Sequence, residues 1–192
     1  ELGPYSDPIG STYYMLMDIG NILLFEPDRS DIKLALRIAA DWLLSKMHPD
    51  GHWEVAYDNK SGSPMFEDVP DLRPTFYGLL VAHQLLKDDK YREGAVKGAN
   101  WFVRHAAKKG WFLGVCGDTR FAPDFATAQS IQALLDMSTL TGDPQYQTAA
   151  YQVARYYTTS VYTHPIPSRE VKHVNGIDRQ DWEISQAGLG FE

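Results

Sequence analysis

Apolar stretches and polar turns recur along the chain at a regular spacing. The pairs Gly78-Leu79, Ala133-Leu134 and Gly188-Leu189 are separated by steps of 55 positions, and the first two lie in apolar stretches of helical length. A short polar turn follows each of these two stretches, at 87–91 and 141–146. A looser copy precedes them, from Thr12 through a turn at 26–30. The repeat predicts consecutive helical hairpins, each with an apolar first helix, a tight turn and a second helix.

The second helix of each hairpin is expected to be amphipathic. Its apolar residues recur at the helical period, which predicts one buried face. Large aromatic residues stand near its end in every copy and favour packing over ligand contact. The stripes are Ile32, Ala35, Leu36, Ala39, Ala40 and Leu43; Tyr91, Ala95, Ala99 and Phe102; and Tyr146, Ala150, Val153 and Tyr157, with Trp42, Trp101 and Tyr156 as the recurring aromatics.

The repeat predicts the architecture. Connections between hairpins are long, roughly 15 to 25 residues against about 4 to 6 for a common loop. Long connections on one side and tight turns on the other favour hairpins that curve round an axis, with the binding face at the rim. We therefore predict an all-α fold, an α/α toroid with about three and a half hairpins in one domain, 1–192. The pattern at 182–191 opens a fourth first helix, so we expect further copies to complete the ring beyond the C-terminus.

Composition narrows the possible partners. Hydrophobic residues make up 44% of the 192 positions, which is enough for a core, and the formal net charge of −7 argues against a nucleic-acid surface. The longest apolar stretch, Tyr13 to Phe25, is interrupted by Asp18 and Asn21 and is too short for a bilayer, so no membrane partner is expected. A single cysteine, Cys116, leaves the compartment open, with a periplasmic or secreted location slightly favoured over a cytoplasmic one.

Two family resemblances point to ring folds. The element from Ala133 to Tyr146 and its counterpart from Leu79 to Tyr91 resemble the six-hairpin glycosidase superfamily, which includes unsaturated glucuronyl hydrolases, and related toroidal polysaccharide lyases. This resemblance implies a carbohydrate-active enzyme. The run 49–53 and the shorter 109–111 are similar to the Gly-x-Trp turns of terpene-cyclase and prenyltransferase toroids, but the acid-rich strings that those enzymes need are absent.

In such toroids the long connections lead to the first helices, so acids just before those helices are catalytic candidates. Asp124 is the first choice, with Arg120 nearby to bind an acidic sugar or hold the carboxylate ionised. Glycosidic cleavage needs a protonated carboxyl group and a second group that activates water or the ring. The alternative is that Asp124 only caps a helix that starts at 125.

The densest polar segment is 173–183. His173, Asp181 and Glu183 are further catalytic candidates, and Arg179 and Trp182 are expected to bind the sugar through its hydroxyl or carboxylate groups and its C–H face. A capped helix with Asp181 as the cap is the alternative.

Other predicted substrate-binding residues are Asp71, Tyr77 and Gln129. Asp71 shares its repeat position with Asp181, and this repetition favours a structural cap. No cofactor and no metal are expected, because Pro49 and Gly51 break any helix that could align His48 with His52.

These residues predict a glycoside hydrolase that acts on an oligo- or polysaccharide, which could contain uronic acid. A polysaccharide lyase with the same toroid is one alternative, with His173, Asn175 and Arg179 at its site. The other is a non-catalytic glycan-binding or scaffold domain of a larger protein.

Overall fold

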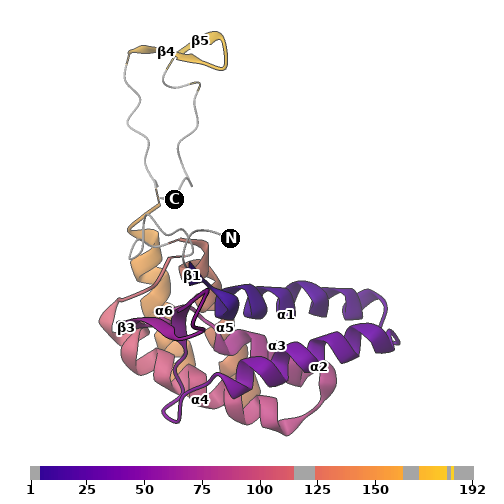
Figure 1. The fold of residues 1–192 in the computed structure, drawn as a ribbon. Coiled ribbons are helices and arrows are strands. Elements are labelled where there is room, and N and C mark those ends of the chain that lie inside the picture. Colours follow the sequence, from indigo (N-terminus) through magenta and orange to yellow (C-terminus); the bar gives the residue numbers. More distant parts are fainter. Residues whose placement is uncertain (1–4, 115–123, 162–168, 181–182, 184–192) are drawn as a thin grey trace.

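The computed structural model describes residues 5–114, 124–161, 169–180 and 183, and these form a mostly helical protein (Figure 1). Six α-helices lie in this part of the chain, and they pair in sequence order as three antiparallel hairpins. The predicted helical class and the three hairpins are therefore confirmed. The helices are α1 (Pro8–Phe25), α2 (Ser30–Ser45), α3 (Phe76–Leu86), α4 (Asp89–His105), α5 (Phe125–Thr141) and α6 (Pro144–Thr158), with a 3-10 turn at Ala107–Lys109.

Aspartate caps set the starts of most helices. Asp7 accepts a hydrogen bond from the Gly10 amide at 2.7 Å at the start of α1, and Asp143 accepts one from the Gln145 amide at 2.9 Å at the start of α6. Each cap is followed by proline at the first helical position, where the missing N–H costs no hydrogen bond. Gly142 ends α5 with a φ of 73°, a left-handed conformation that glycine adopts without strain.

The core lies between the two helices of each hairpin and between α1 and α3. Tyr13 and Leu16 of α1 and Leu79 of α3 are fully buried. Gly78 permits the close crossing of α1 and α3, because a Cβ at this position would lie 3.1 Å from the Cβ of Tyr13. The recurring aromatics pack against this core as predicted, with Trp101 buried and Trp42 and Tyr156 partly buried.

Short strands occupy two of the long connections, which the sequence analysis treated as loops. A three-stranded antiparallel sheet has the order β1 (Tyr5–Ser6), β2 (Glu54–Asp58) and β3 (Pro64–Pro70). A separate hairpin joins β4 (Val171–Val174) to β5 (Ile177–Gln180). Its turn is Asn175-Gly176, with φ of 54° and 78°, the combination that a two-residue hairpin turn requires. The purely α-helical prediction is corrected in these connections.

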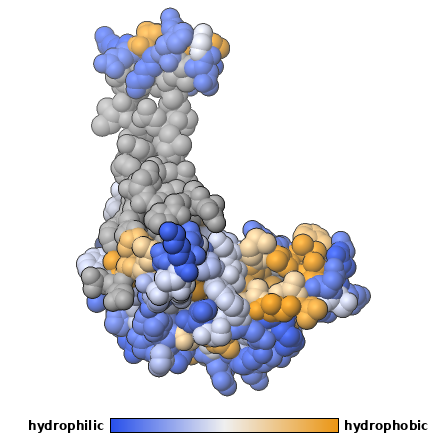
Figure 2. Space-filling model, viewed as in Figure 1, coloured by the Kyte–Doolittle hydropathy of each residue, from blue (hydrophilic) through white to orange (hydrophobic). Residues whose placement is uncertain are grey.

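One side of the first hairpin leaves apolar side chains exposed (Figure 2). Leu24 and Phe25 of α1 are 68% and 86% exposed, and Leu34 and Ile38 of α2 are 59% and 63% exposed. In the described part of the chain, no helix combines the length and the apolar composition that crossing a bilayer requires. The predicted fourth first helix at 182–191 lies outside the described residues except for Glu183.

Candidate functional site

A pocket of about 510 Å³ opens between the first helices of the three hairpins, α1, α3 and α5. This size lies within the range of roughly 300–1,000 Å³ that is typical of small-molecule sites. Three aromatic side chains line it, Tyr14, Tyr77 and Phe125, one from each helix. Polar side chains lie between them, namely Asp18, Asn21, Gln84 and Gln129. We call this the inner-helix pocket.

Two polar atoms at the inner-helix pocket are buried without a hydrogen-bond partner among the described residues. They are the Tyr14 hydroxyl and the Gln129 Oε1 atom. The Gln129 amide nitrogen donates only a weak bond to the Met17 sulfur at 3.4 Å. Burial raises the pKa of Tyr14 to about 12, so the phenol remains a neutral donor at ordinary pH. Buried polar groups normally find partners, and the pocket therefore offers a donor and an acceptor that a ligand could satisfy.

Tyr77 is held in place by a carboxylate. Its hydroxyl donates to Asp136 Oδ2 at 2.7 Å, and Gln132 Nε2 donates to the other carboxylate oxygen at 2.8 Å. Burial, and then the bond to Asp136, raises the pKa of Tyr77 above its ordinary value. The ring is thereby fixed between α3 and α5 at the pocket wall.

Of the residues predicted from sequence, the structure brings two together here, Tyr77 and Gln129. Sequence reasoning missed Tyr14, Asp18 and Gln84 as pocket residues. A signal was present, because Asp18 interrupts an apolar stretch at a position where a buried helix would carry another apolar residue. A polar residue such as Asp18 within a mostly apolar helix indicates that this face of the helix lines a polar pocket.

A buried ion network lies where the long connections meet the starts of α1 and α3. The Arg73 guanidinium, with 2% of its side chain exposed, bonds Asp71 Oδ1 at 2.8 Å and also binds Asp7 through two nitrogens. Burial alone would lower the pKa of Arg73, but the Asp71 and Asp7 carboxylates raise it well above its ordinary value. Asp71 also accepts from the Thr75 hydroxyl at 2.6 Å. These contacts give Asp71 a structural role, but as part of an ion network and not as the predicted helix cap, because α3 begins at Phe76 with Thr75 at its N-cap position.

Asp124 caps α5. Its carboxylate accepts from the backbone amides of Ala126 at 2.9 Å and Thr127 at 3.4 Å, and the Asp124 backbone N–H donates to Thr127 Oγ1 at 3.4 Å. The side chain is buried at the helix start. The capping alternative is confirmed, and the catalytic role of Asp124 stays a prediction.

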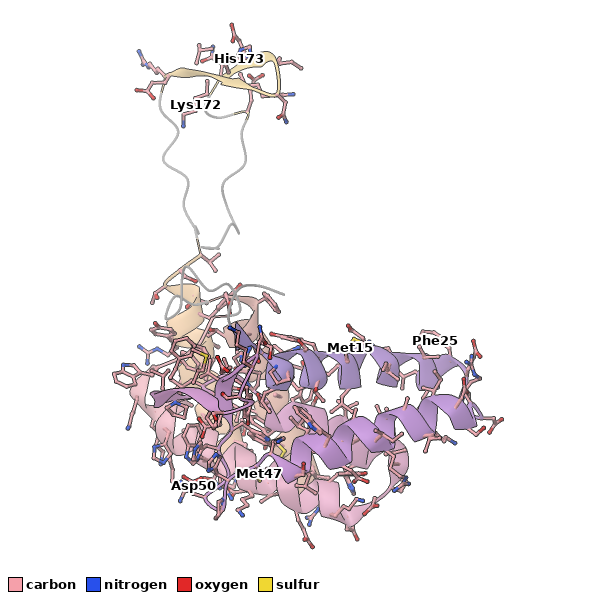
Figure 3. The ribbon with its side chains drawn as sticks, in the orientation of Figure 1. Met15, Phe25, Met47, Asp50, Lys172 and His173 are labelled. Atoms are coloured by element: carbon pink, nitrogen blue, oxygen red, sulfur yellow. The ribbon has the colours of Figure 1, made fainter. Side chains whose placement is uncertain are left out.

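Three further candidates, His173, Arg179 and Glu183, lie on or just after the β4–β5 hairpin, whose side chains are mostly exposed (Figure 3). His173 pairs with Asp178 at 2.8 Å, and Glu183 accepts from the Gln180 amide at 2.7 Å. Arg179 is exposed. Arg120, Asp181 and Trp182 lie outside the described residues.

Three side chains could hold a metal ion. Donor atoms of His48, His52 and Glu54 lie within 4.8 Å of one another, in the turn between α2 and β2. No helix aligns His48 with His52, but a turn brings their two rings together.

No model of a protein family matches the chain, and no curated protein resembles it significantly.

Proposed function

We propose that this chain binds a carbohydrate in the inner-helix pocket, as part of a carbohydrate-active α/α toroid. One observation carries the proposal: the pocket combines three aromatic rings from three helices with polar side chains, and the Tyr14 hydroxyl and Gln129 Oε1 are buried there without partners among the described residues. An aromatic face contacts the C–H face of a sugar, while amide and hydroxyl groups bond its hydroxyls. Phe125 is 46% exposed, which suits a stacking surface at the pocket edge.

The toroid is supported by the order of the hairpins and by the exposed apolar side of the first one. A further hairpin packed against Leu24, Phe25, Leu34 and Ile38 would bury them and continue the curve. In the proposed ring, α1, α3 and α5 form part of the inner wall.

Hydrolysis of a glycosidic bond is the reaction that we propose first. Asp18 is the carboxylate among the described lining residues, and it can act as an acid, a base or a ligand for a sugar hydroxyl. A glycosidase uses two carboxyl groups, separated by about 5–5.5 Å when it retains configuration and by about 6.5–9.5 Å when it inverts it. In this proposal, the second carboxyl group comes from a loop at the pocket mouth.

A non-catalytic glycan-binding domain is the second candidate. It is favoured by the same lining, because the described pocket residues include one carboxylate and no histidine. A polysaccharide lyase is the third candidate. The exposure of His173 on the β4–β5 hairpin weighs against a buried base at that residue.

The test is calorimetric titration with neutral and uronic-acid oligosaccharides. Gln129→Ala should weaken binding about 2- to 10-fold, because one hydrogen bond is worth roughly 0.5–1.5 kcal/mol. Gln152→Ala is the matched control, since Gln152 is exposed on α6 and lies outside the pocket lining. Equal affinities of the two variants for every sugar would overturn the proposal.

Product analysis after incubation with the same sugars distinguishes an enzyme from a binding domain. If the wild type releases new reducing ends, and Asp18→Asn loses this activity but still binds the sugar, the protein is a hydrolase. An unsaturated product identifies a lyase. Binding without either product identifies the non-catalytic domain.

A further inference from the structure

The turn that joins α2 to β2 carries a compact group of metal-binding side chains. It is closed by two backbone bonds, from His48 N to His52 O at 2.9 Å and from Gly51 N to His48 O at 3.0 Å. Gly51 has a φ of 107°, which a side chain would strain, and a Cβ there would lie 2.6 Å from the Lys97 carbonyl oxygen of α4. The backbone of the turn is therefore tightly seated.

The turn places both imidazole rings beside a carboxylate. The His48 and His52 rings stack with centroids 4.1 Å apart and an interplanar angle of 12°. His48 Nε2 lies 2.9 Å from Glu54 Oε1, and the donor atoms of all three side chains lie within 4.8 Å of one another. Two imidazoles and one carboxylate form a ligand set that zinc commonly takes in proteins.

A second carboxylate supports one of the rings. His52 Nδ1 lies 2.5 Å from Asp50 Oδ1. An ion bound through Nε2 keeps this bond, which then orients the ring and raises the basicity of the ligating nitrogen. Carboxylate–histidine–metal arrangements of this kind are general at protein zinc sites.

Packing against the hydrophobic core fixes the backbone of the three ligand residues. Trp53, between His52 and Glu54, is 3% exposed, and its Nε1 donates to the Leu43 carbonyl at 2.9 Å. The Trp101 ring of α4 lies 5.6 Å from the His52 ring. The backbone positions of the ligands are therefore set by the hydrophobic core, and only side-chain rotation remains for metal binding.

Charges of both signs lie near the cluster. Glu54 and Asp50 contribute two carboxylates, while Lys97 and Arg104 of α4 line a hollow together with Asp50. The Glu54 side chain is 13% exposed and His48 is 39% exposed, so the cluster reaches solvent through His48. The side of the cluster that is open to solvent leaves room for water as a further ligand.

We propose that His48, His52 and Glu54 bind one Zn²⁺ ion, with Asp50 as the residue that positions His52. Tetrahedral bonds of about 2.0–2.1 Å separate donor atoms by roughly 3.3 Å, so the present separations must contract by up to about 1.5 Å. Rotation of the two rings out of their stack and loss of the His48–Glu54 contact supply this movement. The site shares no lining residue with the inner-helix pocket and does not depend on the proposed sugar binding.

The test is titration of the chelator-stripped chain with ZnCl₂ in a calorimeter. The expected result is one equivalent bound, and His48→Ala and His52→Ala should each abolish that binding. Asp50→Asn should weaken it about 10- to 100-fold, the usual effect of removing a residue that orients a ligating histidine.

His173→Ala is the matched control. His173 also pairs with an aspartate, at 2.8 Å, but no third ligand lies beside it among the described residues, so its loss should leave the titration unchanged. Co²⁺ gives a second readout, because its visible spectrum reports nitrogen ligation in the wild type and should change in Glu54→Gln. Far-UV circular dichroism verifies that each variant is folded. No zinc binding by the wild type, or equal binding by folded His48→Ala, would overturn the proposal.

Discussion

The buried Arg73 network should be a principal determinant of stability, and Arg73→Met tests it. Methionine keeps an unbranched apolar side chain but removes the positive charge. Asp71, whose side chain is fully buried, then loses the cation at 2.8 Å and keeps its charge in a poorly hydrated site. Removing one partner of a buried pair typically costs about 3–5 kcal/mol, a large share of a total stability of roughly 5–15 kcal/mol.

The other carboxylate of the network should matter much less. The Asp7 side chain is 35% exposed, so solvent screens its attraction to Arg73. Asparagine caps a helix as well as aspartate does, and Asp7→Asn should therefore cost under about 1 kcal/mol. Asp7→Ala also removes the cap on the Gly10 amide and should cost roughly 1 kcal/mol more.

Urea and thermal unfolding followed by circular dichroism measure these differences. For a chain of this size, 1 kcal/mol corresponds to about 2–4 °C in Tm, so Arg73→Met should melt roughly 6–20 °C below the wild type. The double variant Arg73→Met with Asp71→Asn should recover part of the loss, because no uncompensated charge remains. The reasoning is refuted if Arg73→Met unfolds within 1 kcal/mol of the wild type, or if Asp7→Asn is equally damaging.

Two further predictions concern single side chains. Asp124→Ala should cost about 1 kcal/mol in urea unfolding through loss of the α5 cap; an unfolding free energy equal to that of the wild type would contradict capping. Burial raises the pKa of Tyr14 to about 12, above its unfolded value of about 10, so the stability from keeping this phenol neutral is present below pH 10 and is lost as the pH rises through about 12. Ultraviolet titration of the wild type against Tyr14→Phe isolates this ionisation, and a midpoint near 10 would contradict the prediction.

The hairpin repeat was readable from sequence because its causes are local. Apolar residues at the helical period, turn residues after each stretch and the aspartates that cap α1, α4, α5 and α6 act within a few residues of one another. The recurring aromatics were likewise assigned to packing, and Trp101 is buried in the core. The two-residue turn Asn175-Gly176 is an equally local signal for the β4–β5 hairpin. The helical repeat did not predict it, because the hairpin lies in a connection between helices.

The candidate sites depend on contacts between distant residues, which periodicity does not encode. Arg73 meets Asp7 across 66 positions, and Tyr77 meets Asp136 across 59. Which polar residues on the first helices share a cavity depends on how α1, α3 and α5 rotate against one another in the packed core. By itself the sequence determined the helices, their pairing and the Asp124 cap of α5. Only the tertiary structure decided which side chains converge, because that follows from the summed packing of the core.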